Sequence, residues 1–280
     1  MTASAAYNIS RALKNAYLVL ILAFLYLPIA VLITLSFNES RARSHFTGFS
    51  LKWYAALLQD STIMQALYNT LLVAVLASLI ATVFGTLAAV GISRMGKNGK
   101  RVFLGINNLP VLNPDIVTGV SLMILFVFAF RLMGFGSLGL VTMLLAHISF
   151  NTPYVILSVM PRLKQMDPNL YEAALDLGST PMHAFFRVIL PEIFPGVVTG
   201  CMLAFTMSID DFVISFFTTG SGVNNLSTVI YSMARRGINP EINALSTLMF
   251  IAVMVMLFII NIRDSDRNAK EILIKAGEEN

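Results

Sequence analysis

Charged residues are scarce in this sequence. Asp, Glu, Lys and Arg make up 12% of its 280 residues, whereas hydrophobic residues make up 56%. Soluble domains carry about 25% charged residues, so a water-exposed surface of this size cannot be built from so few ionic groups. The composition excludes an ordinary soluble protein and predicts that much of the surface faces lipid.

Cysteine and histidine are also rare. The chain has one cysteine, Cys201, and three histidines, which excludes an internal disulfide and gives no spacing typical of a zinc site. A phosphate-binding loop of the form GxxxxGK[ST] is absent from the sequence, so the chain does not hold ATP in that way. The formal net charge of +4 arises from basic residues between apolar segments, a distribution that does not predict nucleic-acid binding.

Long apolar runs, by contrast, are abundant. A bilayer core about 30 Å thick is crossed by ~20 apolar residues in a helix, and six runs meet or approach that length. We expect them at residues 16–37, 66–93, 109–133, 138–160, 191–218 and 244–262. The sequence therefore predicts an all-α integral membrane protein with six transmembrane helices, forming a single domain over residues 1–280.

The basic residues are unevenly divided between the two ends of these helices. Of the 19 Lys and Arg residues, 13 lie near the two termini or in the loops after the second and fourth spans. Because Lys and Arg accumulate on the cytoplasmic side of membrane proteins, we expect both termini in the cytoplasm. Between the first two spans, residues 51–58 form an amphipathic stretch with Trp53 and Tyr54, which predicts a short helix at the outer membrane interface.

The loop between the fourth and fifth spans, residues 161–190, has the signals of two short helices. Asp167 is a good N-cap, and Pro168 suits the first position of a helix. Apolar residues then recur at spacings of three and four up to Gly178, which can take a positive φ and end the helix. Thr180 caps a second helix. Such a helical corner on the cytoplasmic side suits a cleft in another protein, and an ordinary interfacial loop is the alternative.

Within this loop the sequence resembles a known family. The segments Glu172-Ala173-Ala174, Gly178 and Val188-Ile189-Leu190-Pro191 match the EAA motif of ABC importer permeases, with Val188 where isoleucine is usual. The resemblance implies that the segment is the coupling helix, which fits a groove on an ATPase subunit. The residues that it assigns to this coupling are Tyr171, Glu172, Ala173, Ala174 and Gly178.

Further segments resemble the second of the two permeases of spermidine/putrescine importers. They are scattered from Ser36 to Thr247 and include Asn113-Pro114-Asp115 and Ser208-Ile209-Asp210-Asp211-Phe212. The resemblance implies a multi-pass protein of the bacterial inner membrane with three kinds of partner: a dimer of ATPase subunits, a second, homologous permease and an extracytoplasmic polyamine-binding protein. It places ATP and Mg on the ATPase and no cofactor in this chain.

A carboxylate inside a predicted span indicates a functional or packing role, because inserting it at the centre of a spanning helix costs about 2.5–3.5 kcal/mol on insertion scales. Asp210 and Asp211 lie in the fifth span. We expect one or both to attract the ammonium groups of a polyamine, with Phe212 and Phe216 adding cation–π contacts. The alternative is a packing carboxylate that bonds a neighbouring side chain such as Ser208, and the sequence does not distinguish the two aspartates.

A third carboxylate, Asp115, lies beside Pro110 and Pro114. These prolines should break or kink the third span and free backbone carbonyls near the pathway, so Asp115 is a further candidate for substrate contact, although kinking alone explains the prolines. His147, inside the fourth span, is expected to be a packing or hydrogen-bonded residue and not a ligand.

Three other functions fit parts of the sequence. An importer permease for another solute, such as an amino acid, iron or an oxyanion, shares the coupling loop, although the acidic fifth span argues against an anion. An intramembrane aspartyl protease could use Asp115 with Asp210 or Asp211, but the sequence lacks the G-x-G-D element of those enzymes. A secondary transporter or channel leaves the cytoplasmic corner unexplained.

Overall fold

The structure, a computed structural model, describes residues 3–40, 46–134, 137–167, 169–220, 222–236 and 240–255. In these ranges the regular structure is helical, apart from one isolated β-bridge between Asn38 and Phe49. The chain separates into two compact units, Met1–Ser61 with Ser232–Asn280 and Thr62–Tyr231. The all-helical architecture expected from the apolar runs is confirmed for the described part of the chain.

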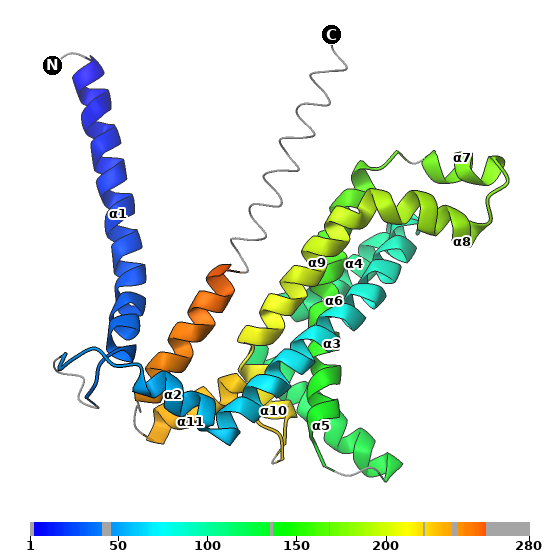
Figure 1. Cartoon of the computed structure of the whole chain (residues 1–280). Coiled ribbons are helices and arrows are strands. Elements are labelled where there is room, and N and C mark those ends of the chain that lie inside the picture. The colour runs from blue at the N-terminus through cyan, green and yellow to red at the C-terminus, as the bar shows by residue number, and fades with distance from the viewer. Residues whose placement is uncertain are drawn as a thin grey trace. The chain divides into compact units, whose positions relative to one another are not determined.

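Figure 1 shows the helices of both units. The first unit contains α1 (Ala3–Ser36), α2 (Lys52–Gln59) and a helix over Pro240–Val255. The larger unit is built from α3 (Ser61–Ser93), α4 (Lys97–Leu112), α5 (Asp115–Met133), α6 (Leu140–Gln165), α7 (Leu170–Asp176), α8 (Pro181–Ala184), the π-helical turn η1 (Phe185–Ile189), α9 (Leu190–Asp210) and α10 (Val213–Thr218). Helix α11 (Leu226–Arg236) begins in the larger unit.

Five of the described helices are long and apolar enough to cross a membrane, and each overlaps one of the first five predicted spans. The chain is therefore a multi-pass membrane protein. The predicted sixth span, residues 244–262, begins within the shorter apolar helix Pro240–Val255. Residues 256–262 of this span lie outside the described residues, as does Pro168 of the predicted corner.

The third span begins later than predicted, at Asp115. A proline disfavours helical backbone at the residue before it, and Asn113, which precedes Pro114, is extended with ψ at 144°. The expected break is thus confirmed at Pro114, whereas Pro110 lies inside α4. Helix α4 was not predicted because basic residues in its first turns lower its hydropathy, and the prediction that residues 109–112 belong to the third span was wrong.

Helices α3, α6 and α9 form the main core of the larger unit and lie side by side in Figure 1. Small residues allow the close approach. A Cβ atom added at Gly85 of α3 would lie 2.7 Å from the Val155 side chain of α6, and one at Gly196 of α9 would lie 2.9 Å from the Ser158 carbonyl oxygen. Small residues at such contacts are typical of helix packing in membranes, where backbones approach closely.

The predicted surface helix of the first unit is present as α2, but its tryptophan does not lie at an exposed interface. Trp53 is 5% exposed, and its Nε1 donates a hydrogen bond to the Asn38 carbonyl oxygen at 2.7 Å. Tyr54 contributes a second tie, with its hydroxyl 2.7 Å from the Ser36 Oγ. The aromatic residues of α2 therefore bind the end of α1 and the segment after it through hydrogen bonds. The amphipathic pattern did not predict this role.

Candidate functional site

The fifth predicted span is interrupted at the double aspartate. Helix α9 ends at Asp210, Asp211 is extended with ψ at 122°, and the six-residue helix α10 starts at Val213. We expected one continuous helix through residue 218, so that prediction was wrong. A break of this kind frees backbone groups, which is tolerated in membrane proteins where the segment is buried in protein or lines a cavity.

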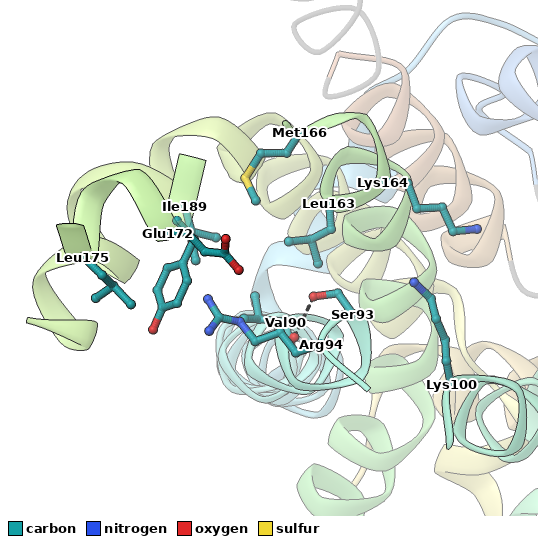
Figure 2. A pocket seen from close by; sticks show the side chains of 11 residues that line it. Val90, Ser93, Arg94, Lys100, Leu163, Lys164, Met166, Glu172, Leu175 and Ile189 are labelled. Atoms are coloured by element: carbon teal, nitrogen blue, oxygen red, sulfur yellow. Dashed lines mark hydrogen bonds between the residues drawn. The ribbon is translucent and has the colours of Figure 1, made fainter. Parts of the chain in front are cut away.

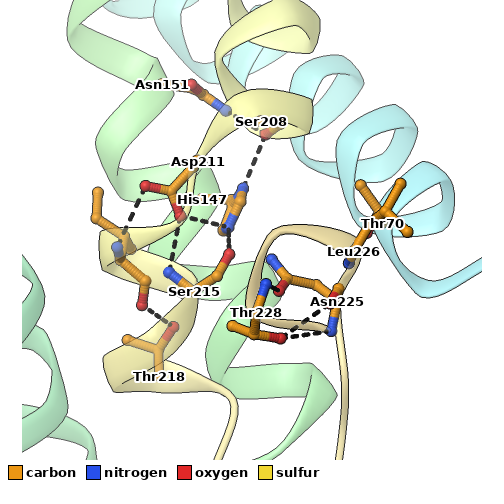
Figure 3. Close-up of polar contacts among 11 residues, drawn as sticks. Thr70, His147, Asn151, Ser208, Asp211, Ser215, Thr218, Asn225, Leu226 and Thr228 are labelled. Atoms are coloured by element: carbon orange, nitrogen blue, oxygen red, sulfur yellow. Dashed lines mark hydrogen bonds and ion pairs between the residues drawn. The ribbon is translucent and has the colours of Figure 1, made fainter. Parts of the chain in front are cut away.

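Asp211 stabilises this break with its carboxylate (Figure 3). Its Oδ1 accepts a hydrogen bond from the Ile214 N–H at 3.2 Å, and its Oδ2 accepts one from the Ser215 N–H at 2.7 Å. These are two of the backbone donors that the first turn of α10 leaves without helical partners. The Asp211 side chain is 7% exposed. Among the predicted alternatives, the structure gives Asp211 the geometry of a packing carboxylate.

A buried histidine completes the network around the break. His147 of α6 is 2% exposed, and its Nε2 lies 3.5 Å from the Asp211 Oδ2 and 2.9 Å from the Ser215 Oγ. Its Nδ1 lies 2.9 Å from the Ser208 Oγ of α9, to which the Asn151 Nδ2 also donates at 2.8 Å. The prediction that His147 is a hydrogen-bonded residue is confirmed. Its partners lie more than 60 positions away, which is why the sequence did not identify them.

Asp210 has a different environment. Its side chain is exposed, and among the described residues it has no hydrogen-bond or ion-pair partner. The two adjacent carboxylates, which the sequence could not distinguish, are therefore separated by the structure. The Asp211 carboxylate is bonded to the break, whereas the Asp210 side chain is exposed.

Three aromatic rings form a cluster that includes Phe212, two residues after Asp210. The Phe212 ring centroid lies 5.5 Å from that of Phe216 and 4.6 Å from that of Tyr231 on α11, and the Phe216 and Tyr231 centroids are 6.3 Å apart. Phe216 is 52% exposed and Tyr231 42% exposed. Ring faces attract cations within about 6 Å, so the exposed rings of this cluster suit a ligand with ammonium groups. Tyr231 was missed because no sequence spacing relates α11 to the double aspartate.

Helix α11, which carries Tyr231, is anchored by its own polar contacts (Figure 3). The Thr70 Oγ1 of α3 accepts a hydrogen bond from the Leu226 N–H at 2.8 Å, and the Asn225 Oδ1 accepts one from the Thr228 N–H at 2.9 Å. The second contact has the geometry of an N-cap. The start of α11 is thus fixed to α3 close to the ring cluster.

The third predicted carboxylate, Asp115, is exposed at the first position of α5. A negative charge there is favoured by the helix dipole, which gives Asp115 a local structural role. One turn further on, a Cβ atom at Gly119 would lie 2.9 Å from the Phe217 ring of α10. The structure thus brings the segment of Asp115 towards α10, although Asp115 has no hydrogen-bond or ion-pair partner in the described part of the chain.

The predicted helical corner is present at the far end of α9. Helix α7 ends before Gly178, whose φ of 86° is the expected positive value, and the Thr180 Oγ1 accepts a hydrogen bond from the His183 N–H. The predicted start was wrong by two residues. Helix α7 begins at Leu170, and the Asp167 carboxylate caps the turn before it by accepting a hydrogen bond from the Asn169 N–H at 2.9 Å.

The motif residues of α7 divide between two faces. Glu172 and Ala173 are exposed, whereas Ala174 is buried. Exposed apolar side chains extend the outer face, with Leu177 88% and Met182 67% exposed. Apolar groups that protrude in this way from a loop mark a surface for contact with a protein or a membrane.

Tyr171 joins this corner to the spans. The Arg94 guanidinium carbon lies 3.6 Å from the Tyr171 ring centroid, a cation–π distance. Arg94 directly follows α3, so the stack ties α7 to the end of a spanning helix, and Figure 2 shows the guanidinium close to the corner. Among the predicted coupling residues, Tyr171 thus faces inward and Glu172 lies exposed at the surface.

Comparisons with known proteins identify a family for the chain. Residues 81–263 match the family described as binding-protein-dependent transport system inner membrane component. The putrescine transport system permease protein PotI of Escherichia coli (strain K12) is 41% identical over 238 residues, which cover 84% of this chain and 85% of PotI. The spermidine/putrescine transport system permease protein PotC of the same strain is 39% identical over 248 residues, which cover 89% of this chain and 92% of PotC.

The fold is also found among solved structures. A chain of a bacterial ABC transporter involved in the import of the acidic polysaccharide alginate matches with a TM-score of 0.71 at 15% identity, over 93% of this chain and 98% of that chain. At this identity the likeness concerns the fold alone.

Proposed function

Because the chain belongs to the family of binding-protein-dependent transport system inner membrane components, we propose that it is a permease subunit of an ATP-driven importer that carries polyamines into a bacterial cell. Members of this family are parts of transport systems, so the chain is a transport subunit and not an enzyme. The intramembrane protease is thereby ruled out as an alternative. A permease for another solute remains the second candidate, and the choice between the two depends on the site at the helix break.

The observation that carries the polyamine proposal is the exposed carboxylate of Asp210, two residues before a cluster of three aromatic rings. A polyamine is a flexible chain with several ammonium groups. One ammonium can pair with a carboxylate while the next lies over a ring, with cation–π contacts of about 0.5–2 kcal/mol each. An oxyanion would be repelled at Asp210, and the printed substrates of the two similar permeases, putrescine and spermidine, agree with a cation.

The proposed assembly has four kinds of component besides lipid. A second, homologous permease would complete the pathway with this chain, and a binding protein outside the membrane would deliver the solute, as the family description indicates. Two ATPase subunits would hold ATP and Mg, since this sequence has no phosphate-binding loop. The proposed topology has six spans in the bacterial inner membrane with both termini in the cytoplasm, supported by the distribution of basic residues.

Coupling in this proposal depends on a continuous helical run. Residues Pro181–Asp210 form 30 consecutive helical residues, made of α8, the π-helical turn η1 and α9. One end adjoins Gly178 and the exposed Glu172, and the other ends at Asp210. When the ATPase subunits close, they would displace the corner, and this helical run would pass the displacement to the break and its rings. The pathway would then alternate between outward and inward access.

The experiment that tests this proposal is uptake of labelled spermidine by cells that lack their own polyamine importers and express this permease with its partner subunits. ATP-dependent uptake that putrescine competes for would support the substrate. Glu172→Ala should abolish most of it, whereas Asp176→Ala, an exposed acidic residue at the end of α7, should retain it. Uptake of neither polyamine by an assembled complex would sink the substrate proposal, and equal uptake by both variants would sink the coupling role of Glu172.

A further inference from the structure

A cavity of about 550 Å³ lies behind the helical corner, between α7 and the ends of α3, α4 and α6. Figure 2 shows its lining side chains. We propose that this cavity binds the phosphate headgroup of an anionic phospholipid from the inner leaflet. The position at the inner leaflet depends on the topology given above under the proposed function, whereas the lipid site itself is argued from the lining.

The first argument is charge. Three cationic side chains from different elements line the cavity, Arg94 after α3, Lys100 on α4 and Lys164 near the end of α6. Within the described residues none of the three has a carboxylate at ion-pair distance. With one carboxylate against three cations in its lining, the cavity keeps a net positive charge, which attracts an anion.

The single carboxylate in the lining, Glu172, lies on the side of α7. It is exposed and belongs to the motif proposed to meet the ATPase. Pairing of Glu172 with a cation of the ATPase would leave the cavity with its three positive charges. Docking of the ATPase and binding of an anion would then favour each other.

The second argument is the mixed character of the walls. Apolar side chains such as Val90, Leu163 and Ile189 share the lining with the cations, and a free phosphate ion has no use for them. A phospholipid presents a phosphate and, next to it, glycerol and acyl groups. Basic pockets between spanning helices at the cytoplasmic side are suited to such headgroups.

The third argument is place. The cavity lies where α3 ends at Ser93 and α6 ends at Gln165, and the ends of spanning helices lie at the level of the lipid headgroups. Arg94, stacked on Tyr171, holds the coupling helix against this level. A bound headgroup would therefore brace the corner from the membrane side while the ATPase contacts its outer face.

The test measures binding of phosphatidylglycerol to the purified complex, by native mass spectrometry after delipidation and titration, with phosphatidylcholine as the neutral reference. The double variant Lys100→Gln with Lys164→Gln should bind phosphatidylglycerol at least about tenfold more weakly, because each basic residue near an anionic lipid contributes roughly a fivefold factor. The matched control is Lys97→Gln, an exposed lysine of the same helix that does not line the cavity, and it should bind like the unchanged complex.

Two further arms keep the result interpretable. Replacing Lys100 and Lys164 by arginine retains the charge and should retain binding, which separates charge from folding. Equal binding by the double glutamine variant and the control overturns the inference, and so does displacement of the lipid by inorganic phosphate at similar concentrations. The readout requires no transported solute, so a complex that binds phosphatidylglycerol through these lysines but carries no polyamine would refute the proposed function alone.

Discussion

Replacement of the two adjacent aspartates should have opposite consequences. Asp211→Ala removes the acceptor of the Ile214 and Ser215 N–H groups and leaves His147 without its carboxylate. A buried donor left without a partner costs about 1–3 kcal/mol, and Asp211→Ala leaves two such donors. We therefore expect Asp211→Ala to lower the free energy of unfolding by about 2–4 kcal/mol.

Asp210→Ala removes an exposed side chain without a partner among the described residues. Surface substitutions of this kind usually change stability by less than about 0.5 kcal/mol. The loss should appear in transport instead. A charge-assisted contact of about 1.5 kcal/mol corresponds to a roughly tenfold rise in the spermidine concentration for half-maximal uptake.

The assay compares the melting temperature of the purified complexes with their uptake of labelled spermidine. Asp211→Asn serves as the graded control, since its amide oxygen can still accept one of the two hydrogen bonds, and it should melt between Asp211→Ala and the unchanged chain. These roles are refuted if the Asp211→Ala complex melts at the same temperature as the unchanged complex. They are also refuted if the Asp210→Ala complex melts at a lower temperature than the Asp211→Ala complex.

Substitutions at other positions test the helical corner, the packing of α9 on α6 and the ring cluster. Gly178→Ala places a side chain at a φ of 86° where no atom lies within 4 Å of the new Cβ. We expect a loss of about 1 kcal/mol from backbone strain alone, with ATP hydrolysis less tightly linked to uptake in a vesicle assay. Gly196→Val overpacks the contact between α9 and α6 and should destabilise by about 1–3 kcal/mol in thermal melting, whereas Gly105→Ala, with open space around it, should be neutral or stabilising. Tyr231→Leu keeps an apolar side chain but loses a ring face, so half-maximal uptake should need a severalfold higher spermidine concentration while that of Tyr231→Phe stays close to the unchanged value; equal values for the two variants would remove Tyr231 from the site.

Features encoded by local sequence were predictable. Apolar runs gave the first five spans, and the turn residues around Gly178 gave the helical corner with its positive φ. Both depend on neighbours within one or two helical turns. The start of α7 and the start of the third span were displaced by a few residues, because capping by Asp167 and the extended residue before Pro114 shift helix ends in ways that periodicity does not record.

Features that depend on distant residues were not predictable. The network of His147 joins three helices through Ser208, Asp211 and Ser215, and nothing in the local sequence of α6 identifies these partners. The same holds for Tyr231, which reaches Phe212 from another helix. The sequence marked the double aspartate as unusual through its cost in a membrane, but only the packed helices show which carboxylate is occupied.

The separation of roles at the break also bears on how such a permease can change its solute. Asp211 and His147 maintain the backbone path of the break, and neither needs to touch the cargo. Asp210, Phe216 and Tyr231 are exposed. Evolution can therefore exchange the second group for other polar or aromatic residues while the scaffold persists. We therefore expect position 210 to tolerate substitution and its neighbour, position 211, not to tolerate it. Relatives that carry different solutes should differ at position 210 more often than at position 211.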